Sequence, residues 1–183
     1  HSNKENKMAQ TDIHKYTVVE KLNKMDVDLI DISATLTSDG TSGDLMFDVT
    51  EIPYAVSVNG GTGILQSVVA IVTDNSTDAS GDGANITGGF KLVITSDSTS
   101  IGSVSDAIGA DTSTRAVLDG ICCITDITYV TDHGYFGVFS KDNIGAIVKA
   151  ESSSTSLYAY GITSSTNDYN GATITLRLGF VKD

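Results

Sequence analysis

The sequence predicts an all-β protein, an antiparallel β-sandwich of about nine strands with a jelly-roll-like arrangement. Apolar and polar residues alternate with a period of two along most of the chain, and helical periodicity is nearly absent. Turns rich in Gly, Asn, Asp and Ser separate the alternating runs. The 183 residues suffice for one sizeable core, and they exceed the roughly 100 residues of an immunoglobulin-like sandwich, so the length favours a jelly roll.

The first predicted strand, 27–36, places most of its apolar residues at alternating positions. The alternation changes phase at Leu29–Ile30, which predicts a β-bulge there. The turn SDGTSGD follows, and 45–49 form the second strand. Pro53 then separates it from a third strand at 54–58, because proline is accepted at the start or the edge of a strand.

The sequence NGGTG at Asn59–Gly63 predicts a hairpin turn, because Gly and Asn tolerate positive φ. It lacks the Lys-Ser/Thr and the helix of a phosphate-binding loop. Residues 64–72 are apolar on both faces, which indicates a central strand. The longest polar loop, 74–89, precedes a strand at 90–95, and 98–119 is the one place for a short helix.

The predicted sandwich is completed by strands at 121–130, 144–150, 157–162 and 174–181. No repeat of roughly 20–50 residues is visible, which argues against a solenoid or propeller. We therefore expect 26–183 to fold as a single β-sandwich domain.

Residues 1–25 differ from the rest. Residues 1–7 resemble a vector remnant behind a histidine tag, with Met8 as the natural start and no secretion signal, which predicts synthesis in a cytoplasm. Residues 9–25 fit neither periodicity well and form either an arm lying on a neighbouring subunit or an edge strand or frayed terminus. Three residues of this segment are interface candidates: Lys15, Lys21 and Lys24.

The charge excludes two classes of partner. The formal net charge is −12, and Lys91 is the only basic residue between Lys24 and Arg115. Such a surface repels phosphate, so no nucleic-acid partner is expected. No apolar run reaches the roughly 18–20 residues that cross a bilayer, so no membrane partner is expected either.

The sequence indicates no enzyme. His133 lies in a predicted turn, and a hydrolase using it as a base would need a nucleophile on a sharp turn, yet the chain contains no GxSxG. Cys122 and Cys123 are adjacent, and a disulfide between neighbours is strained. They are expected as two reduced thiols on opposite faces of one strand, where burial raises the pKa of a thiol and lowers its reactivity.

Calcium is the one cofactor for which the sequence offers candidates. Asp74, Asp78 and Asp82 recur at every fourth position of the long polar loop. Flexible loops supply the carboxylate oxygens that Ca²⁺ prefers, but the spacing is not that of an EF-hand, and a solvated loop explains it equally well. Zinc lacks clustered Cys and His ligands, and no other cofactor is expected.

Two tyrosines form the remaining candidate site. Tyr158 and Tyr160 lie two apart in a predicted strand and therefore share a face. They indicate a subunit interface, a surface that stacks on sugars, or part of the core.

Four segments carry a family resemblance: EIPYAVSVNGGTGILQSVVAIVTDN, KLVITSD, DNIGAIVKAESSSTSLYAYGI and the ending LRLGFVKD. With them, residues 45–183 resemble a group of small virion structural proteins of marine tailed phages, cyanophages among them. The resemblance implies a non-enzymatic particle component, a capsid decoration (cement) or accessory tail protein. It implies capsid or tail proteins as partners and the virion, assembled in the host cytoplasm, as the location.

A decoration protein is made in many copies, so we expect a homo-oligomer, with a trimer as the first expectation. The alternative is a carbohydrate-binding or adhesion module that uses the tyrosines and the 74–89 loop.

Overall fold

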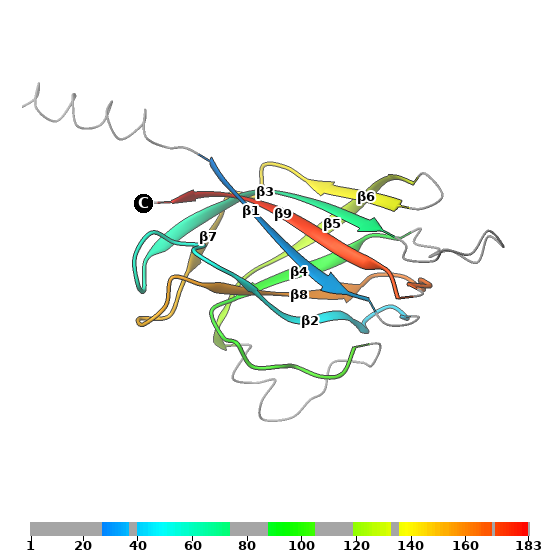
Figure 1. Ribbon diagram of the computed structural model, residues 1–183, viewed down its shortest axis with the longest axis horizontal. Helices are drawn as coiled ribbons and strands as arrows, with labels where there is room; N and C mark the ends of the chain where they lie inside the picture. The colour runs from blue at the N-terminus through cyan, green and yellow to red at the C-terminus, as the bar shows by residue number, and fades with distance from the viewer. Residues whose placement is uncertain are drawn as a thin grey trace, which may run out of the picture.

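The structure, a computed structural model, describes residues 27–36, 40–73, 88–104, 119–132, 136–169 and 171–182. It confirms the all-β prediction (Figure 1). The described residues form nine strands: β1 (Val27–Thr35), β2 (Leu45–Ile52), β3 (Thr62–Thr73), β4 (Phe90–Thr95), β5 (Ile121–Asp132), β6 (Phe136–Lys141), β7 (Ala146–Lys149), β8 (Leu157–Thr163) and β9 (Thr173–Lys182).

The strands pair in order from the two ends of the sequence toward its middle. β1 pairs with β9, β2 with β8, β3 with β6 and β4 with β5, all antiparallel. This nesting is that of one long antiparallel hairpin rolled up on itself. The full order, β1-β9-β3-β6-β5-β4-β8-β2, divides into a first sheet of β1, β9, β3, β6 and β7 and a second sheet of β5, β4, β8 and β2. The fold is a jelly roll.

The two sheets are joined along one side by β5. This strand pairs with β4 as far as Ile127 and with β6 from Thr128 onward, so it passes from the second sheet into the first. On the opposite side β1 and β2, the two ends of the strand order, contact each other. The sandwich is therefore a nearly closed barrel.

β6 and β7 are two halves of one strand position beside β3. β6 pairs with the C-terminal half of β3 and β7 with its N-terminal half, and the four residues 142–145 form the break between them. At the break the Gln66 carbonyl accepts a hydrogen bond of 3.0 Å from the Ile144 amide, and β3 carries a bulge at Gln66. The sequence pattern predicts the strand at 144–150 but not the one at 136–141.

The bulge predicted at Leu29–Ile30 is wrong. β1 pairs with β9 residue for residue, without a register shift, from Val27 to Thr35. Ile30 lies half-buried against the core, whereas the Leu29 side chain is 64% exposed on the outer face. The change of phase arises because this end of β1 is apolar on both faces.

The strand predicted at 54–58 is also wrong. β2 continues to Ile52, and the chain then crosses from the second sheet to the first through an irregular segment. In this segment the side chains do not alternate between core and solvent, because the consecutive residues Ala55 and Val56 are both buried in the core. The turn at Asn59–Gly63 exists, with the Gly61 amide donating to the Val58 carbonyl at 2.8 Å, but it joins strands of different sheets and is no hairpin.

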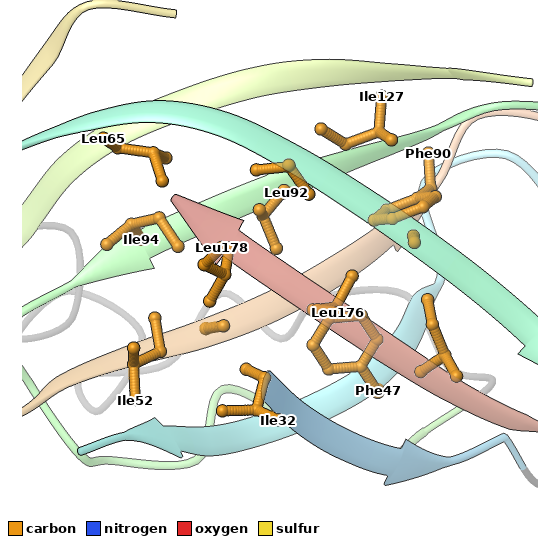
Figure 2. Packing of buried hydrophobic residues seen from close by; sticks show 14 of the residues in the cluster. Ile32, Phe47, Ile52, Leu65, Phe90, Leu92, Ile94, Ile127, Leu176 and Leu178 are labelled. Carbon is orange, nitrogen blue, oxygen red and sulfur yellow. The ribbon is translucent and has the colours of Figure 1, made fainter. Parts of the chain in front are cut away.

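The core lies between the two sheets (Figure 2). Each sheet contributes the side chains that alternate inward along its strands. Those labelled in Figure 2 are Ile32, Leu65, Leu176 and Leu178 from the first sheet and Phe47, Ile52, Phe90, Leu92, Ile94 and Ile127 from the second sheet and β5. Each large apolar side chain that is fully buried stabilises the fold by about 1.5–3 kcal/mol relative to an exposed one.

A buried polar cluster holds the loops at the far end of the barrel from Val27. The Asn167 side chain donates to Thr163 Oγ1 at 3.0 Å and to Tyr169 Oη at 3.2 Å, and it accepts from the Gly88 amide at 3.4 Å. Its backbone pairs with Gly40 through two bonds of 2.9 Å. Asn167 therefore connects three separate inter-strand segments.

We expect Asn167→Ala to lower the free energy of unfolding by about 1–3 kcal/mol, because the buried hydroxyls of Thr163 and Tyr169 and the part-buried Gly88 amide each lose one hydrogen bond. Urea unfolding followed by circular dichroism measures the change. Thr166→Ala, at an exposed neighbouring position, is the control and should change stability by less than about 0.5 kcal/mol. Equal effects of the two substitutions would contradict this role for Asn167.

Candidate functional site

The outer face of the first sheet carries an unbroken row of apolar side chains. Val27 on β1 lies opposite Val181 on β9, Val181 lies opposite Ile64 on β3, and Ile64 lies opposite Ile147 on β7. Residues directly opposite each other on neighbouring strands point to the same face with Cβ atoms about 4.5–5.5 Å apart. These four residues, together with Leu29, are called the apolar row.

The apolar row is open to solvent at its two ends. Val27 is 50% exposed, Leu29 64% and Ile147 70%, whereas Val181 in the middle is 9% exposed. The side chains of Val27 and Ser67 lie close over Gly179 on β9. A Cβ at Gly179 would lie 3.1 Å from Val27 Cγ1 and 2.5 Å from Ser67 Oγ, so a larger residue would displace them. The row is therefore an apolar surface formed by side chains of four neighbouring strands, β1, β9, β3 and β7.

The charges beside the apolar row differ from those of the protein as a whole. Asp31 and Arg177, the next outward pair on β1 and β9, form a two-point ion pair with distances of 2.9 and 2.8 Å. The hydrogen bonds from Arg177 hold the pKa of Asp31 below its ordinary value. Lys149 is exposed on β7, two residues beyond Ile147 and on the same face. These outward groups sum to +1 in a chain of net charge −12.

Part of the outer face of the second sheet is covered by its own chain, while Ile124 on β5 and Glu51 on β2 stay exposed. Tyr160, Leu45 and Val93 are buried there with Ile101, which belongs to the segment after β4. The Tyr160 hydroxyl donates to the Thr99 carbonyl at 2.5 Å. The Asp48 carboxylate accepts hydrogen bonds from Ser100 Oγ and from the Ile101 amide. Segment 96–101 is therefore fastened over the sheet.

Tyr160 consequently belongs to the core and is no exposed interface residue. Its relative exposure is 0%, and burial, with the nearby carboxylates of Asp48 and Asp97, raises the pKa of its hydroxyl far above the ordinary value. Tyr158 shares its face as predicted but is only half-buried, between Thr95 and Glu51 on the neighbouring strands. Tyr158 stays an interface candidate.

The two cysteines do not face opposite sides of β5. The register of β5 against β4 shifts between Ile121 and Cys123, which makes Cys122 the extra residue of a bulge. Both side chains are therefore half-buried against the same main core. Cys122 Sγ lies 3.5 Å from the Lys149 carbonyl, in hydrogen-bonding position. Burial, with a smaller contribution from Cys122, raises the pKa of Cys123 to about 11.

We expect the Cys123 thiol to react slowly with iodoacetamide near neutral pH. The thiolate is the reactive form, and a rise of two pKa units from 9.0 to about 11 lowers its population about a hundredfold. Peptide mapping after brief labelling of native and urea-unfolded protein at pH 8 measures the ratio. Equal labelling of Cys123 in the two states would contradict the burial of this thiol.

Several candidates from the sequence lie outside the described residues. They are the possible calcium ligands Asp74, Asp78 and Asp82, the arm lysines Lys15, Lys21 and Lys24, and His133. Within the parts of the chain that the structure describes, no three His, Cys, Asp or Glu side chains gather in a way that would hold a metal ion. The same parts contain no helix with the length and hydropathy needed to cross a bilayer.

Comparison with known proteins gives no family. No protein-family model matches the chain, and no curated protein matches it. The resemblance to virion proteins stays a prediction.

Sequence reasoning missed the apolar row, although two signals of it are present. One is the apolar pair Leu29–Ile30, and the other is the segment 64–72, which is apolar on both faces. Both indicate strands with apolar residues on the outer as well as the inner face. Only the register shows that Val27, Ile64 and Ile147 align, because β1, β3 and β7 are far apart in the sequence.

Proposed function

We propose that this protein is a non-enzymatic structural component of a phage particle, acting in capsid decoration through contacts between identical copies. The observation that carries the proposal is the apolar row. Side chains such as Leu29 and Ile147, 64% and 70% exposed on the outer face of a sheet, are typical of a surface that a protein partner covers.

The fold supports the proposal at the level of class. Jelly rolls recur in viral capsid proteins, and also in lectins and cupins, so the architecture fits a particle component and does not select it by itself. The core supports a robust domain, since large apolar side chains of both sheets pack together in one cluster (Figure 2).

Two measurements test the proposal. Light scattering of the full chain is expected to give a homo-oligomer, and a monomer at all concentrations would contradict it. Co-sedimentation with marine tailed-phage particles is expected for the full chain and not after deletion of residues 1–25, while the circular-dichroism spectrum of the truncated protein stays unchanged. Undiminished co-sedimentation of the truncated protein would contradict attachment to the particle through residues 1–25.

A carbohydrate-binding module is the second candidate, and Tyr54 is the observation that favours it. This tyrosine is 74% exposed and adopts a φ of 54°, a conformation that costs a bulky residue about 1–2 kcal/mol. An exposed ring on a fixed backbone is suited to stacking on a sugar. A glycan array decides: a specific signal that Tyr54→Ala abolishes favours the module, and silence favours decoration.

A further inference from the structure

We infer that the apolar row docks head-to-tail onto the acidic side of a second copy of this chain, formed by the outer surface of the second sheet. The inference rests on the proposed homo-oligomeric function and adds to it the two surfaces that meet. Its first basis is the open apolar row itself, which crosses all four strand positions of the first sheet.

The second basis is the unequal charge of the two sheets. The strands of the first sheet, with the part of β5 that pairs with β6, hold four basic and three acidic residues, a net charge of +1: Lys141, Lys149, Arg177 and Lys182 against Asp28, Asp31 and Asp132. The strands of the second sheet, with β5 as far as Ile127, hold one basic and three acidic residues, a net charge of −2: Lys91 against Asp48, Glu51 and Asp126. The two sides of one molecule are therefore complementary in charge.

The acidic side also offers apolar area to the partner. Glu51 is exposed on β2, and its opposite residue on β8 is the half-buried Tyr158. Three residues after Glu51 stands Tyr54, 74% exposed. Asp97 lies on the segment fastened over the same sheet. Aromatic rings beside carboxylates suit a surface that is apolar with a basic margin, such as the apolar row with Lys149.

Charge further decides between the two ways in which copies can meet. A two-fold contact between two apolar rows would bring the surplus positive charges of Lys149 together, and like charges in a contact oppose it. A head-to-tail contact instead places the apolar row and Lys149 of one copy against Glu51 and Asp97 of the next. A head-to-tail contact closes only in a ring of three or more copies, because a two-fold axis makes the two surfaces identical. The smallest ring is the trimer, with a mass of about 57 kDa from three chains of 19.1 kDa.

The first experiment places a charge in the apolar row. Ile147→Asp is expected to raise the dissociation constant of the oligomer about tenfold or more, because it puts a carboxylate where an apolar side chain is covered and repels the acidic partner. Val130 is 56% exposed near the C-terminal end of β5 and is not part of the apolar row. Val130→Asp is therefore the matched control and should leave the oligomer intact. Should Ile147→Asp fail to fold by circular dichroism, Lys149→Glu tests the same surface.

The second experiment separates head-to-tail from two-fold contacts. Ile147→Asp and Glu51→Lys each spoil one of the two surfaces, so each variant alone is expected to be monomeric. An equimolar mixture retains one intact surface of each kind and is expected to form a species of two copies by light scattering. A Glu51→Lys protein that keeps the wild-type oligomer, or a mixture that stays monomeric, overturns the inference.

The wild-type protein separates failure of the inference from failure of the proposed function. A monomeric wild type contradicts both. A wild-type dimer, or an oligomer that Ile147→Asp and Lys149→Glu leave intact, overturns the inference while homo-oligomeric function stands. Raising NaCl from 0.05 to 0.5 M is expected to weaken the wild-type oligomer, since salt screens the attraction between the faces; an oligomer that salt strengthens would contradict the charge argument.

Discussion

Phe90→Ala is expected to lower the free energy of unfolding by about 3–5 kcal/mol, the range for removing a large buried aromatic side chain. Phe90 is 1% exposed on β4. Its ring lies 6.5 Å from that of Phe47 on β2 and 5.7 Å from that of Phe139 on β6, both edge-on. It therefore joins the two sheets, and its removal leaves a cavity that neither sheet can close without moving the other.

Guanidinium unfolding followed by circular dichroism measures this effect. Val130→Ala is the control for loss of apolar volume without a cavity, since Val130 is 56% exposed and its truncation should cost less than about 0.5 kcal/mol. A loss below about 1 kcal/mol for Phe90→Ala would mean that the sheets collapse readily around the site. The packing between them would then be looser than the structure shows.

The strands that the sequence predicts well are those whose inward face carries an apolar residue at every second position. This holds in 27–36, 90–95 and 174–181, and the predicted bounds lie within a residue of β1, β4 and β9. Alternation is a local property of the chain. It can therefore be seen without knowledge of the partner strands.

The prediction failed where apolar residues serve something other than a paired strand. Residues 54–58 alternate, yet they carry the chain from one sheet to the other, and Ala55 and Val56 fill the end of the core. At Leu29 the outer face is apolar, which imitates a bulge. The bulge at Cys122 has no signature in the sequence, because residues 121–124 are all apolar and show no change of phase.

The candidate surfaces were beyond local reasoning for a different reason. Each depends on which strands become neighbours. Tyr160 is buried because segment 96–101 crosses the second sheet, and the apolar row exists because β1, β9, β3 and β7 align their outward residues. Sequence patterns indicate strand faces, whereas long-range register decides which faces combine into a surface.

Gly161→Ala is expected to lower the free energy of unfolding by about 3 kcal/mol, at the upper end of what overpacking a core costs. Gly161 is buried on β8 opposite Phe47 of β2. A Cβ there would lie 2.5 Å from Phe47 Cδ1 and 3.0 Å from Phe47 Cζ, inside van der Waals contact. The ring has little room to withdraw, because Phe47 is 1% exposed and packs on Phe90.

A double-mutant cycle with Phe47→Leu tests the cause directly. Leucine lacks the ring atoms that oppose the new methyl group, so the double variant should be more stable than the sum of the two single effects predicts, by about 1 kcal/mol or more. Urea unfolding of the four proteins measures the coupling. Strict additivity would show that Gly161 is needed for its backbone and not for the space it leaves to Phe47. The glycine would then have no part in seating the aromatic side chains that hold the two sheets together.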